Sequence, residues 1–320
     1  MDRFLDIIIP QYNENEELVK RLLNSILDQN QVNFNEIGVI IVNDGSDEIL
    51  SKEFLDNYKD LNIQYIKNKK NLGQGPTEQN GINHSKAKYI TFVDADDELI
   101  PNRLHYAIDT LKKHNFNILL SHFIEEIYIN GKTSYFTHKI DLLHYLHGVF
   151  IKKEYLDVKN IKFSDEIRYC EDTYFTRILF MQSPEPPILA MPIYLWKYNK
   201  DSLMRSNNLI KKIYDDLFKS LFLSYEYLIK VENKKENEYM LLSGFFDLFV
   251  KLESNQFDKR RLNKQEKELY AKYLEYKDIF DKYKDLLNKF YDSELLTNKE
   301  VFKDFESNVS FDSFLKKMEN

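Results

Sequence analysis

Short apolar runs alternate with amphipathic segments along the first hundred residues. The apolar runs, rich in Ile, Val, Tyr and Phe, predict strands over residues 6–9, 36–42, 63–66 and 89–93. The intervening segments, with apolar residues at helical spacing, predict helices over residues 16–28, 51–58 and 77–85. Pro10 is expected to end the first strand. This alternation predicts an α/β fold, in which a mostly parallel sheet is covered by helices on both faces.

Turn-forming residues become scarce beyond residue 200. Every proline lies before residue 193, and Gly244 is the one glycine beyond Gly148. The residues that follow carry apolar side chains at helical spacing, at Leu209, Ile213, Leu217, Leu221 and Tyr225, and again at Leu269, Tyr273, Tyr276, Phe280, Tyr283 and Leu287. We therefore predict an α/β domain over 1–205 and a helical domain over 206–320. Its apolar faces are expected to pack on the first domain or on another subunit.

The composition is that of a globular protein. Of 320 residues, 43% are hydrophobic and 30% are charged, which allows a sizeable core and argues against disorder. The longest apolar runs fall short of the ~18 residues that span a bilayer, and the N-terminus lacks the pattern of a secretion signal. The single cysteine, Cys170, excludes an internal disulfide and fits a reducing compartment. We expect a cytoplasmic protein, either free or held peripherally at the inner membrane face.

The charge and the amino-acid bias indicate which binding partners and which kind of source organism to expect. The net charge is −7, and no region has the basic excess of a nucleic-acid-binding protein, so duplex DNA or RNA is not expected as the main partner. The bias toward Lys, Asn, Ile and Tyr suggests an AT-rich genome, as in a low-GC bacterium or its phage.

Polar residues gather where three of the predicted strands end. They form the clusters Pro10–Asn13, Asn43–Asp47 and Asp94–Asp97. Ligands of open α/β sheets bind at the carboxyl ends of the strands, so these clusters predict one shared site. The alternative is that they are ordinary turns and helix caps, because Asn, Asp, Gly and Ser favour both.

The third cluster suggests a metal site. Asp94 and Asp96 lie two residues apart after a buried strand, where a bend would aim both at one ion. Carboxylates this close repel each other unless a cation neutralises them. Oxygen ligands select a hard cation, here Mg²⁺ or Mn²⁺, whose remaining ligands would come from substrate phosphates and water. An Asp-x-Asp pair is frequent by chance, and its position after the strand strengthens this interpretation.

Taken in order, the motifs resemble those of the family 2 glycosyltransferases, which have the Rossmann-like GT-A fold. The resemblance rests on Ile7-Ile8-Ile9-Pro10-x-Tyr12-Asn13, Val42-Asn43-Asp44-Gly45-Ser46-Asp47, Asn71-x-Gly73, Asn80-Gly81-Ile82 and Phe92-Val93-Asp94-Ala95-Asp96-Asp97. It extends more loosely through Cys170-Glu171-Asp172 and the segment Tyr194-Leu195-Trp196-Lys197-Tyr198, followed by Ser202 and Arg205. Nothing beyond residue 205 is covered.

The resemblance implies a metal-dependent, inverting transfer of sugar from a nucleotide-sugar, typically a UDP-sugar, to a hydroxyl of a glycan, wall polymer or glycoprotein. Asp94 and Asp96 would form the metal site, with Asp96 as the main direct ligand. Asp172, beside Glu171, would be the general base. The donor would be bound by Pro10, Tyr12, Asn13, Asp44, Asn71, Gln79, Asp94, Ala95 and Arg205. The helical domain would then serve acceptor placement or self-association.

One position departs from the family pattern. Gln79 stands where the family often has Arg before Asn-x-Gly. The charge contact to the donor is then either lost or supplied by Lys69, Lys70 or Arg205.

Several residues have plainer interpretations. Glu171 and Asp172 also fit an acidic pair at the start of a helix. Tyr194, Trp196 and Tyr198 stack on a sugar or, as is more common for aromatic residues at every second position, pack a strand on the core.

Other kinds of site fit the sequence poorly. His144 and His147 would share a helix face, but two histidines without further ligands do not predict a zinc site. Cys170, next to two acids, is expected to be a packing residue. The segment 71–75 lacks the third glycine of a dinucleotide loop, so a Rossmann dehydrogenase is rejected. A non-catalytic module that binds a nucleotide-sugar or glycan remains the alternative function.

Overall fold

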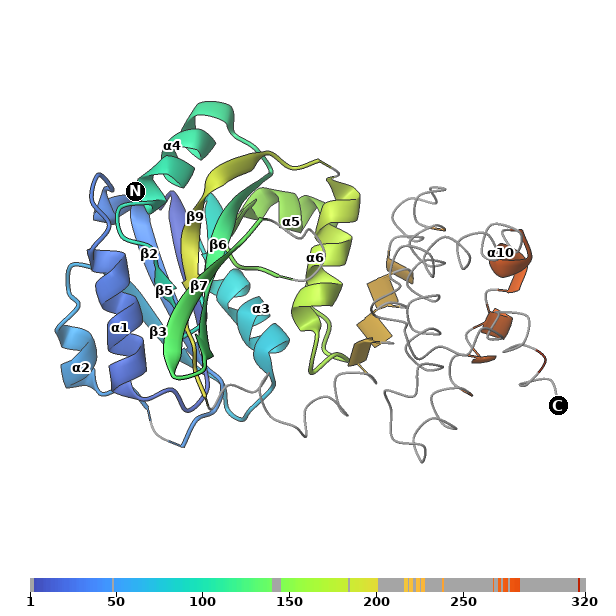
Figure 1. Ribbon diagram of the computed structural model, residues 1–320, viewed down its shortest axis with the longest axis horizontal. Coiled ribbons are helices and arrows are strands. Elements are labelled where there is room, and N and C mark those ends of the chain that lie inside the picture. Colours follow the sequence, from blue (N-terminus) through green and yellow to red (C-terminus); the bar gives the residue numbers. More distant parts are fainter. Residues whose placement is uncertain are drawn as a thin grey trace. The chain divides into compact units, whose positions relative to one another are not determined.

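The structure is a computed structural model, which describes residues 3–47, 49–139, 145–183 and 185–200, together with scattered residues between 216 and 316 (Figure 1). The chain forms two compact units, Met1–Ile210 and Lys211–Asn320. No helix in the described ranges is long and apolar enough to cross a membrane.

The first half of the sheet is parallel. Its strands follow the order β3-β2-β1-β4 and are β1 (Leu5–Gln11), β2 (Ile37–Asn43), β3 (Asn62–Lys67) and β4 (Tyr89–Phe92). All four predicted strands are confirmed. The expectation that Pro10 ends the first strand is wrong, because β1 continues to Gln11 and Pro10 lies opposite Val42 in β2. Because Pro10 has no backbone N–H, β1 lacks one hydrogen-bond donor at this position. Its parallel pairing with β2 nevertheless continues to Gln11.

The second half of the sheet is largely antiparallel. It contains β5 (Glu98–Leu99), β6 (Ile118–Ile129), β7 (Lys132–His138), β8 (Val149–Lys152) and β9 (Ile188–Trp196). The full order is β3-β2-β1-β4-β8-β6-β9-β5, with β7 paired to β6. Strand β8 runs antiparallel to both β4 and β6, and only β6 and β9 pair in parallel. The sheet is therefore mixed, which corrects the expectation of a mostly parallel sheet. That expectation came from the first hundred residues, where β1, β2 and β3 are each followed by a helix.

Helices cover both faces of the sheet. They are α1 (Glu16–Leu27), the 3₁₀ turn η1 (Phe34–Glu36), α2 (Lys52–Asp56), α3 (Gln74–His84), α4 (Leu104–His114), α5 (Lys153–Lys159) and α6 (Glu171–Gln182). The first two α-helices begin at side-chain caps: Asn15 accepts a hydrogen bond from the Leu18 N–H, and Ser51 from the Phe54 N–H. The three helices predicted in the first hundred residues are confirmed, and the second is shorter than expected.

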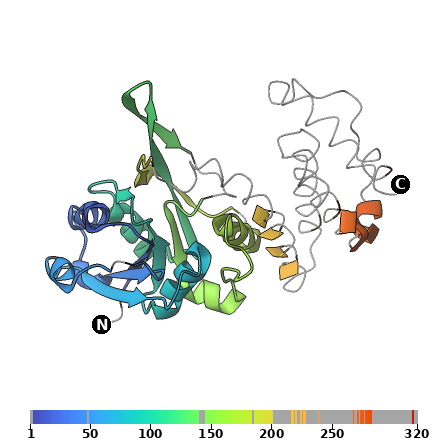
Figure 2. The ribbon, with the colours of Figure 1, turned by 90° about the horizontal axis from the view of Figure 1, so that it is seen from below.

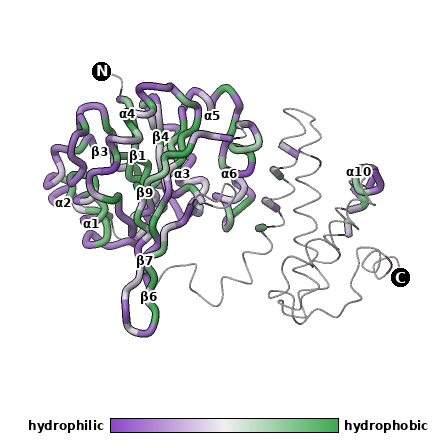
Figure 3. Tube along the Cα trace, turned by 45° about the horizontal axis from the view of Figure 1, so that its top comes forward, coloured by the Kyte–Doolittle hydropathy of each residue, from purple (hydrophilic) through white to green (hydrophobic). Residues whose placement is uncertain are grey.

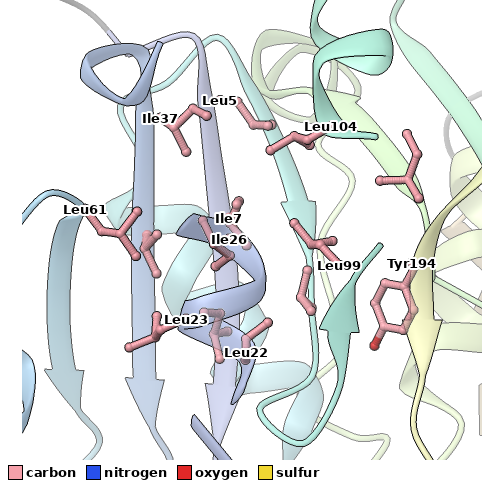
Figure 4. Packing of buried hydrophobic residues seen from close by; sticks show 14 of the residues in the cluster. Leu5, Ile7, Leu22, Leu23, Ile26, Ile37, Leu61, Leu99, Leu104 and Tyr194 are labelled. Atoms are coloured by element: carbon pink, nitrogen blue, oxygen red, sulfur yellow. The ribbon is translucent and has the colours of Figure 1, made fainter. Parts of the chain in front are cut away.

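Alternate residues of the central strands point to opposite faces. Ile7 and Ile9 of β1 pack with Leu22, Leu23 and Ile26 of α1 on one face (Figure 4). Helices α2 and α4 add to the same cluster. Figure 3 shows the apolar strands enclosed by polar loops. This burial of whole apolar strands stabilises the edge of the sheet at which the site lies.

On the other face, helices α3 and α6 lie against the sheet, as Figure 2 shows from below. Gly81 of α3 lies so close to β1 that a methyl group at this position would overlap Cγ2 of Ile8. Phe92 of β4 packs edge-on against Phe163 and Phe175, with ring centroids 5.8 Å and 6.3 Å away. These ring contacts pack α6 and the loop before it against β4.

In the second unit, the described residues include helix α10 (Lys277–Lys282). Tyr273 and Phe280 are buried, and their ring centroids lie 5.5 Å apart. They belong to the second predicted apolar stripe. The first stripe is largely outside the described residues, and so are His144, Ser202 and Arg205.

Candidate active site

The carboxyl ends of β1 and β2 are tied together by polar contacts. The Asp44 N–H donates to the Gln11 carbonyl at 2.7 Å, and the Asn13 N–H donates to Ser46 Oγ at 2.9 Å. The Asn43 side-chain amide donates to Gln11 Oε1 at 3.0 Å. The first two polar clusters therefore form one surface, at the edge of the sheet where Asp94–Asp97 follows β4.

Asp44 organises the loop that leads into α3. Its Oδ1 accepts hydrogen bonds from the Leu72 N–H at 2.8 Å and from Asn68 Nδ2 at 3.0 Å, and its Oδ2 accepts one from the Gly73 N–H at 2.9 Å. Gly73 has φ +97°, a conformation that glycine adopts without strain. Asn71 in the same loop accepts from Arg168 Nη2 at 2.6 Å. Asp44 is thus buried and holds the Asn71–Gly73 loop in place.

The three aspartates after β4 have different partners. Asp94 Oδ1 accepts from Gln74 Nε2 at 3.1 Å, and Asp94 Oδ2 lies 3.7 Å from His147 Nε2. Asp96 Oδ2 accepts from Asn199 Nδ2 at 2.8 Å. Burial and the charge of Asp94 raise the pKa of Asp96.

Asp97 is buried. It accepts from the Tyr194 hydroxyl and, at 2.8 Å, from the Lys197 N–H, so it anchors the loop to β9.

Glu171 and Asp172 form the first turn of α6. Cys170 precedes them at the N-cap with φ +59° and is partly buried. Asp172 Oδ1 accepts from the Thr173 N–H at 2.6 Å. Burial raises the pKa of Asp172 to about 6, although the Thr173 N–H and His147 act in the opposite direction and Asp94 adds to the increase. The pair does start a helix, as the plainer interpretation holds, but Asp172 also acts electrostatically on the Asp94 loop.

Comparison with known proteins identifies the family. The model of glycosyl transferase family 2 matches residues 6–170. The chain belongs to glycosyltransferase family 2. It is therefore a transferase enzyme, and its mixed sheet between helices is a GT-A-like fold.

Curated relatives of this glycosyltransferase come from archaea and bacteria. It is 33% identical over 132 residues to an uncharacterized glycosyltransferase of Methanocaldococcus jannaschii, covering 39% of this chain and 44% of the relative. It is 28% identical over 213 residues to the minor teichoic acid biosynthesis protein GgaB of Bacillus subtilis, covering 61% of this chain and 23% of the relative.

It is also 27% identical over 195 residues to the poly(ribitol-phosphate) beta-N-acetylglucosaminyltransferase TarP of Staphylococcus aureus, covering 56% of this chain and 58% of the relative. The chain thus spans less than two thirds of these relatives.

A solved structure shares the fold of this glycosyltransferase. The structure of S. aureus TarS 1-349 in complex with UDP has a TM-score of 0.64 and 17% sequence identity, and covers 82% of this chain and 78% of that one. At this identity the likeness shows the fold alone.

The carboxylates of the glycosyltransferase site fit a divalent cation. Single ligand atoms of Asp94, Asp97 and His147 lie within 4.8 Å of one another. Burial, with the charges of Asp96 and Asp94, raises the pKa of Glu14 to about 7. Carboxylates that raise each other's pKa bind a hard cation readily, because the ion relieves their repulsion. The sequence pointed to Asp94 and Asp96, whereas the group of ligand atoms that the described residues bring together is that of Asp94, Asp97 and His147. The role of Asp96 stays a prediction.

Other predicted donor residues have defined places. Pro10 lies in β1 and Ala95 follows β4, and Tyr12, which follows β1, is 47% exposed. Gln79 Oε1 accepts from the Phe163 N–H at 3.0 Å and Gln79 Nε2 donates to Asn83, so its side chain joins α3 to the loop before α6. Arg205 lies outside the described residues.

Tyr194 belongs to the core and Trp196 packs against it, as the commoner interpretation holds. Tyr198 lies beyond the end of β9, with its ring beside that of Tyr128. Tyr194 lies in β9 and is buried, and the His147 ring stacks on it with a centroid distance of 4.3 Å. The expected helix face for His147 is wrong, because His147 lies in the turn before β8.

Sequence reasoning missed Gln74, Glu78 and His147. Glu78 lies on the buried stripe of α3 with Gly75 and Ile82, at spacings of three and four residues. An acidic residue on such a stripe is a signal that could have been read. His147 offers none, because only the packing of β8 beside β4 brings it to Asp94.

Proposed function

We propose that this protein is a metal-dependent, inverting glycosyltransferase that moves a sugar from a UDP-sugar to a hydroxyl of a glycan or wall polymer. The observation that carries the proposal is that Asp172, with a pKa of about 6, lies within electrostatic reach of Asp94 on the metal-binding loop. A base and a charge-stabilising group on one side of the sheet are the minimum that direct displacement requires.

Asp172 is assigned as the general base. A carboxylate with a pKa of about 6 is mostly ionised at neutral pH and still takes a proton from a hydroxyl more readily than an ordinary Asp does. Glu171 is buried, with its Cβ and Cγ against Gly75, and is assigned to the wall of the site. Single displacement at the sugar carbon by the deprotonated hydroxyl inverts that centre.

Asp96 and Asp94 are assigned as the ligands of Mn²⁺ or Mg²⁺. Both oxygens of Asp97 already accept hydrogen bonds, from Tyr194 and Lys197, so Asp97 is assigned to support the loop. When bound, the cation supplies the positive charge that stabilises the departing diphosphate. Asp94 also contacts Gln74 and His147, which fix its carboxylate before the donor arrives.

The nucleotide is assigned to the loops after β1 and β2. Tyr12 offers an exposed ring to the base, and Asp44 shapes the Asn71–Gly73 loop. Gln79 is held by Phe163 and Asn83, so it contributes to the donor site through α3. UDP is proposed as the nucleotide because TarS, which shares this fold, has been solved in complex with UDP.

The acceptor is proposed to be a hydroxyl of a bacterial surface polysaccharide or wall polymer. Support comes from the names of the relatives GgaB and TarP, which refer to teichoic acid and poly(ribitol-phosphate). We propose residues 1–205 as the catalytic domain, acting in the cytoplasm, and 206–320 as the region that places the acceptor or joins subunits.

The test is release of UDP from a panel of UDP-sugars, with and without Mn²⁺, for the unchanged protein and for Asp172→Asn. Loss of the base is expected to slow transfer by at least ~10²-fold while donor binding by calorimetry is kept. The matched control is Asp157→Asn, which changes an exposed carboxylate paired with Lys153.

Normal turnover by Asp172→Asn would overturn the assignment of the base. If Glu171→Gln were inactive at the same time, the role would pass to the neighbour. UDP binding by the unchanged protein without any turnover would instead favour the non-catalytic module.

A further inference from the structure

A buried carboxyl group lies beside the proposed reaction centre without a full set of hydrogen bonds. Glu78 of α3 is 2% exposed. Its Oε1 accepts one hydrogen bond, from Gln74 Nε2 at 3.3 Å, and its Oε2 has no partner among the described residues. A buried polar atom without a hydrogen-bond partner lowers the free energy of unfolding, so its presence requires a functional explanation.

Glu78 faces acids from two other elements. The charges that act most strongly on it are those of Glu171, Asp94 and Asp172. The close approach of α3 and α6 makes this geometry, because a methyl group at Gly75 would lie 3.0 Å from Glu171 Cβ. Glu78, one turn further along α3, therefore lies between α6 and the loop after β4, where its Oε1 shares the Gln74 amide with Asp94.

The amide of Gln74 shows what kind of group this space accepts. Its Nε2 lies 3.1 Å from Asp94 Oδ1 and 3.3 Å from Glu78 Oε1, so one N–H donor is shared by two carboxyl groups. Gln74 is exposed, and its side chain is able to move aside for a ligand that offers hydroxyl or N–H donors of its own. A ligand carboxylate in the same place would meet four acids.

The place of Glu78 between Asp94 and Asp172 identifies the ligand. Under the proposed function, on which this step rests, the transferred sugar lies between the diphosphate near Asp94 and the base Asp172. We propose that Glu78 binds the transferred sugar through its hydroxyl or amide N–H groups, and that this acid-lined pocket selects a neutral or amino sugar and rejects a uronic acid.

The test compares donor pairs that differ only at the sugar C6 group, UDP-glucose with UDP-glucuronate and UDP-galactose with UDP-galacturonate, by calorimetry on the full chain with Mn²⁺. UDP alone measures the nucleotide contribution. In the unchanged protein we expect each uronate to bind at least ~10-fold more weakly than its neutral partner, from like-charge repulsion in a partly buried site.

Glu78→Met keeps the volume and removes both oxygens. It is expected to leave UDP binding unchanged, to weaken the better neutral UDP-sugar by ~10-fold or more, and to raise the melting temperature, because the unpartnered buried oxygen is gone. Glu78→Gln keeps the hydrogen bonds and is expected to bind that UDP-sugar within ~3-fold of the unchanged protein. The control is His84→Ala, at the exposed C-terminal end of the same helix.

Two results would overturn the inference. One is a Glu78→Met protein that binds UDP-sugars as well as the unchanged protein does. The other is an unchanged protein that binds the uronates as tightly as their neutral partners. Failure to bind UDP at all would instead refute the proposed nucleotide site, so the two failures are distinguishable.

Discussion

At the residue scale, Asp172 combines a catalytic assignment with a cost in stability. Burial raises its pKa to about 6, above the ordinary value for Asp. The folded protein therefore binds this proton more tightly than the unfolded chain does, and the stability that results is lost as pH rises through about 6. Functional sites often keep such charges at the expense of stability.

The first prediction follows from this loss of stability with rising pH. At pH 7.5, Asp172→Asn is expected to be more stable than the unchanged protein, by on the order of 1–3 kcal/mol. The difference is expected to vanish below about pH 4, where the carboxyl is protonated in both states. Urea unfolding at the two pH values measures it. An equal difference at both would show that the effect is packing and not charge.

A second prediction at this scale concerns the metal. Asp96→Asn is expected to abolish activity together with Mn²⁺ dependence while the fold is kept, and Asp94→Asn to do so more weakly. The reason is that an amide oxygen carries no net charge to bind a divalent cation. Manganese titration followed by electron paramagnetic resonance measures binding directly, and full turnover by Asp96→Asn in EDTA would refute the metal site.

At the scale of elements, the approach of α3 to β1 sets the geometry of the site. Gly81 allows the contact, since a methyl group there would overlap Cγ2 of Ile8. The first turn of the same helix carries Gln74, and its second carries Glu78, both of which contact groups of the site. A change at the packed end of α3 is thus expected to reach the sugar pocket.

Gly81→Ala tests this. Alanine favours a helix over glycine by ~1 kcal/mol, but overpacking against Ile8 is expected to outweigh the gain and destabilise the protein by ~1–3 kcal/mol. Chemical unfolding gives the stability, and UDP-sugar binding is expected to weaken more than UDP binding. His84→Ala, at the exposed C-terminal end of α3, is the control and should be close to neutral. A stable Gly81→Ala protein would mean that α3 shifts at little cost.

At the scale of the whole molecule, residues 1–205 and residues 206–320 are expected to have different functions. The family motifs lie before residue 206, and the sequence of 206–320 predicts helices with apolar stripes that need a partner surface. A shortened chain ending at Ser206 is expected to bind the UDP-sugar with unchanged affinity and to lose transfer to the natural acceptor. Calorimetry on both chains measures the first, and a transfer assay the second. A soluble, folded short chain that binds no donor would show that the helices complete the catalytic core.

The sequence by itself determined the elements of the first hundred residues and the edge of the sheet at which the site lies. Strand and helix periods are local properties, and the carboxyl ends of parallel strands such as β1 and β2 necessarily meet at one edge. The motifs through Asp94–Asp97 also sufficed for the family, which comparison confirmed. The roles of Asp94, Asp96 and Asp172 stay predictions.

Only the tertiary structure decided the pairing in the second half of the sheet and the positions of the acids around Glu78. The antiparallel pairing of β8 with β4 depends on contacts between distant segments, which local periodicity does not encode. That pairing brings His147 to within 3.7 Å of Asp94. The charges of Glu171 and Asp172 act on Glu78 because Gly75 lets α3 and α6 approach closely. Packing between distant segments thus determined the positions of the side chains that are proposed to select the transferred sugar.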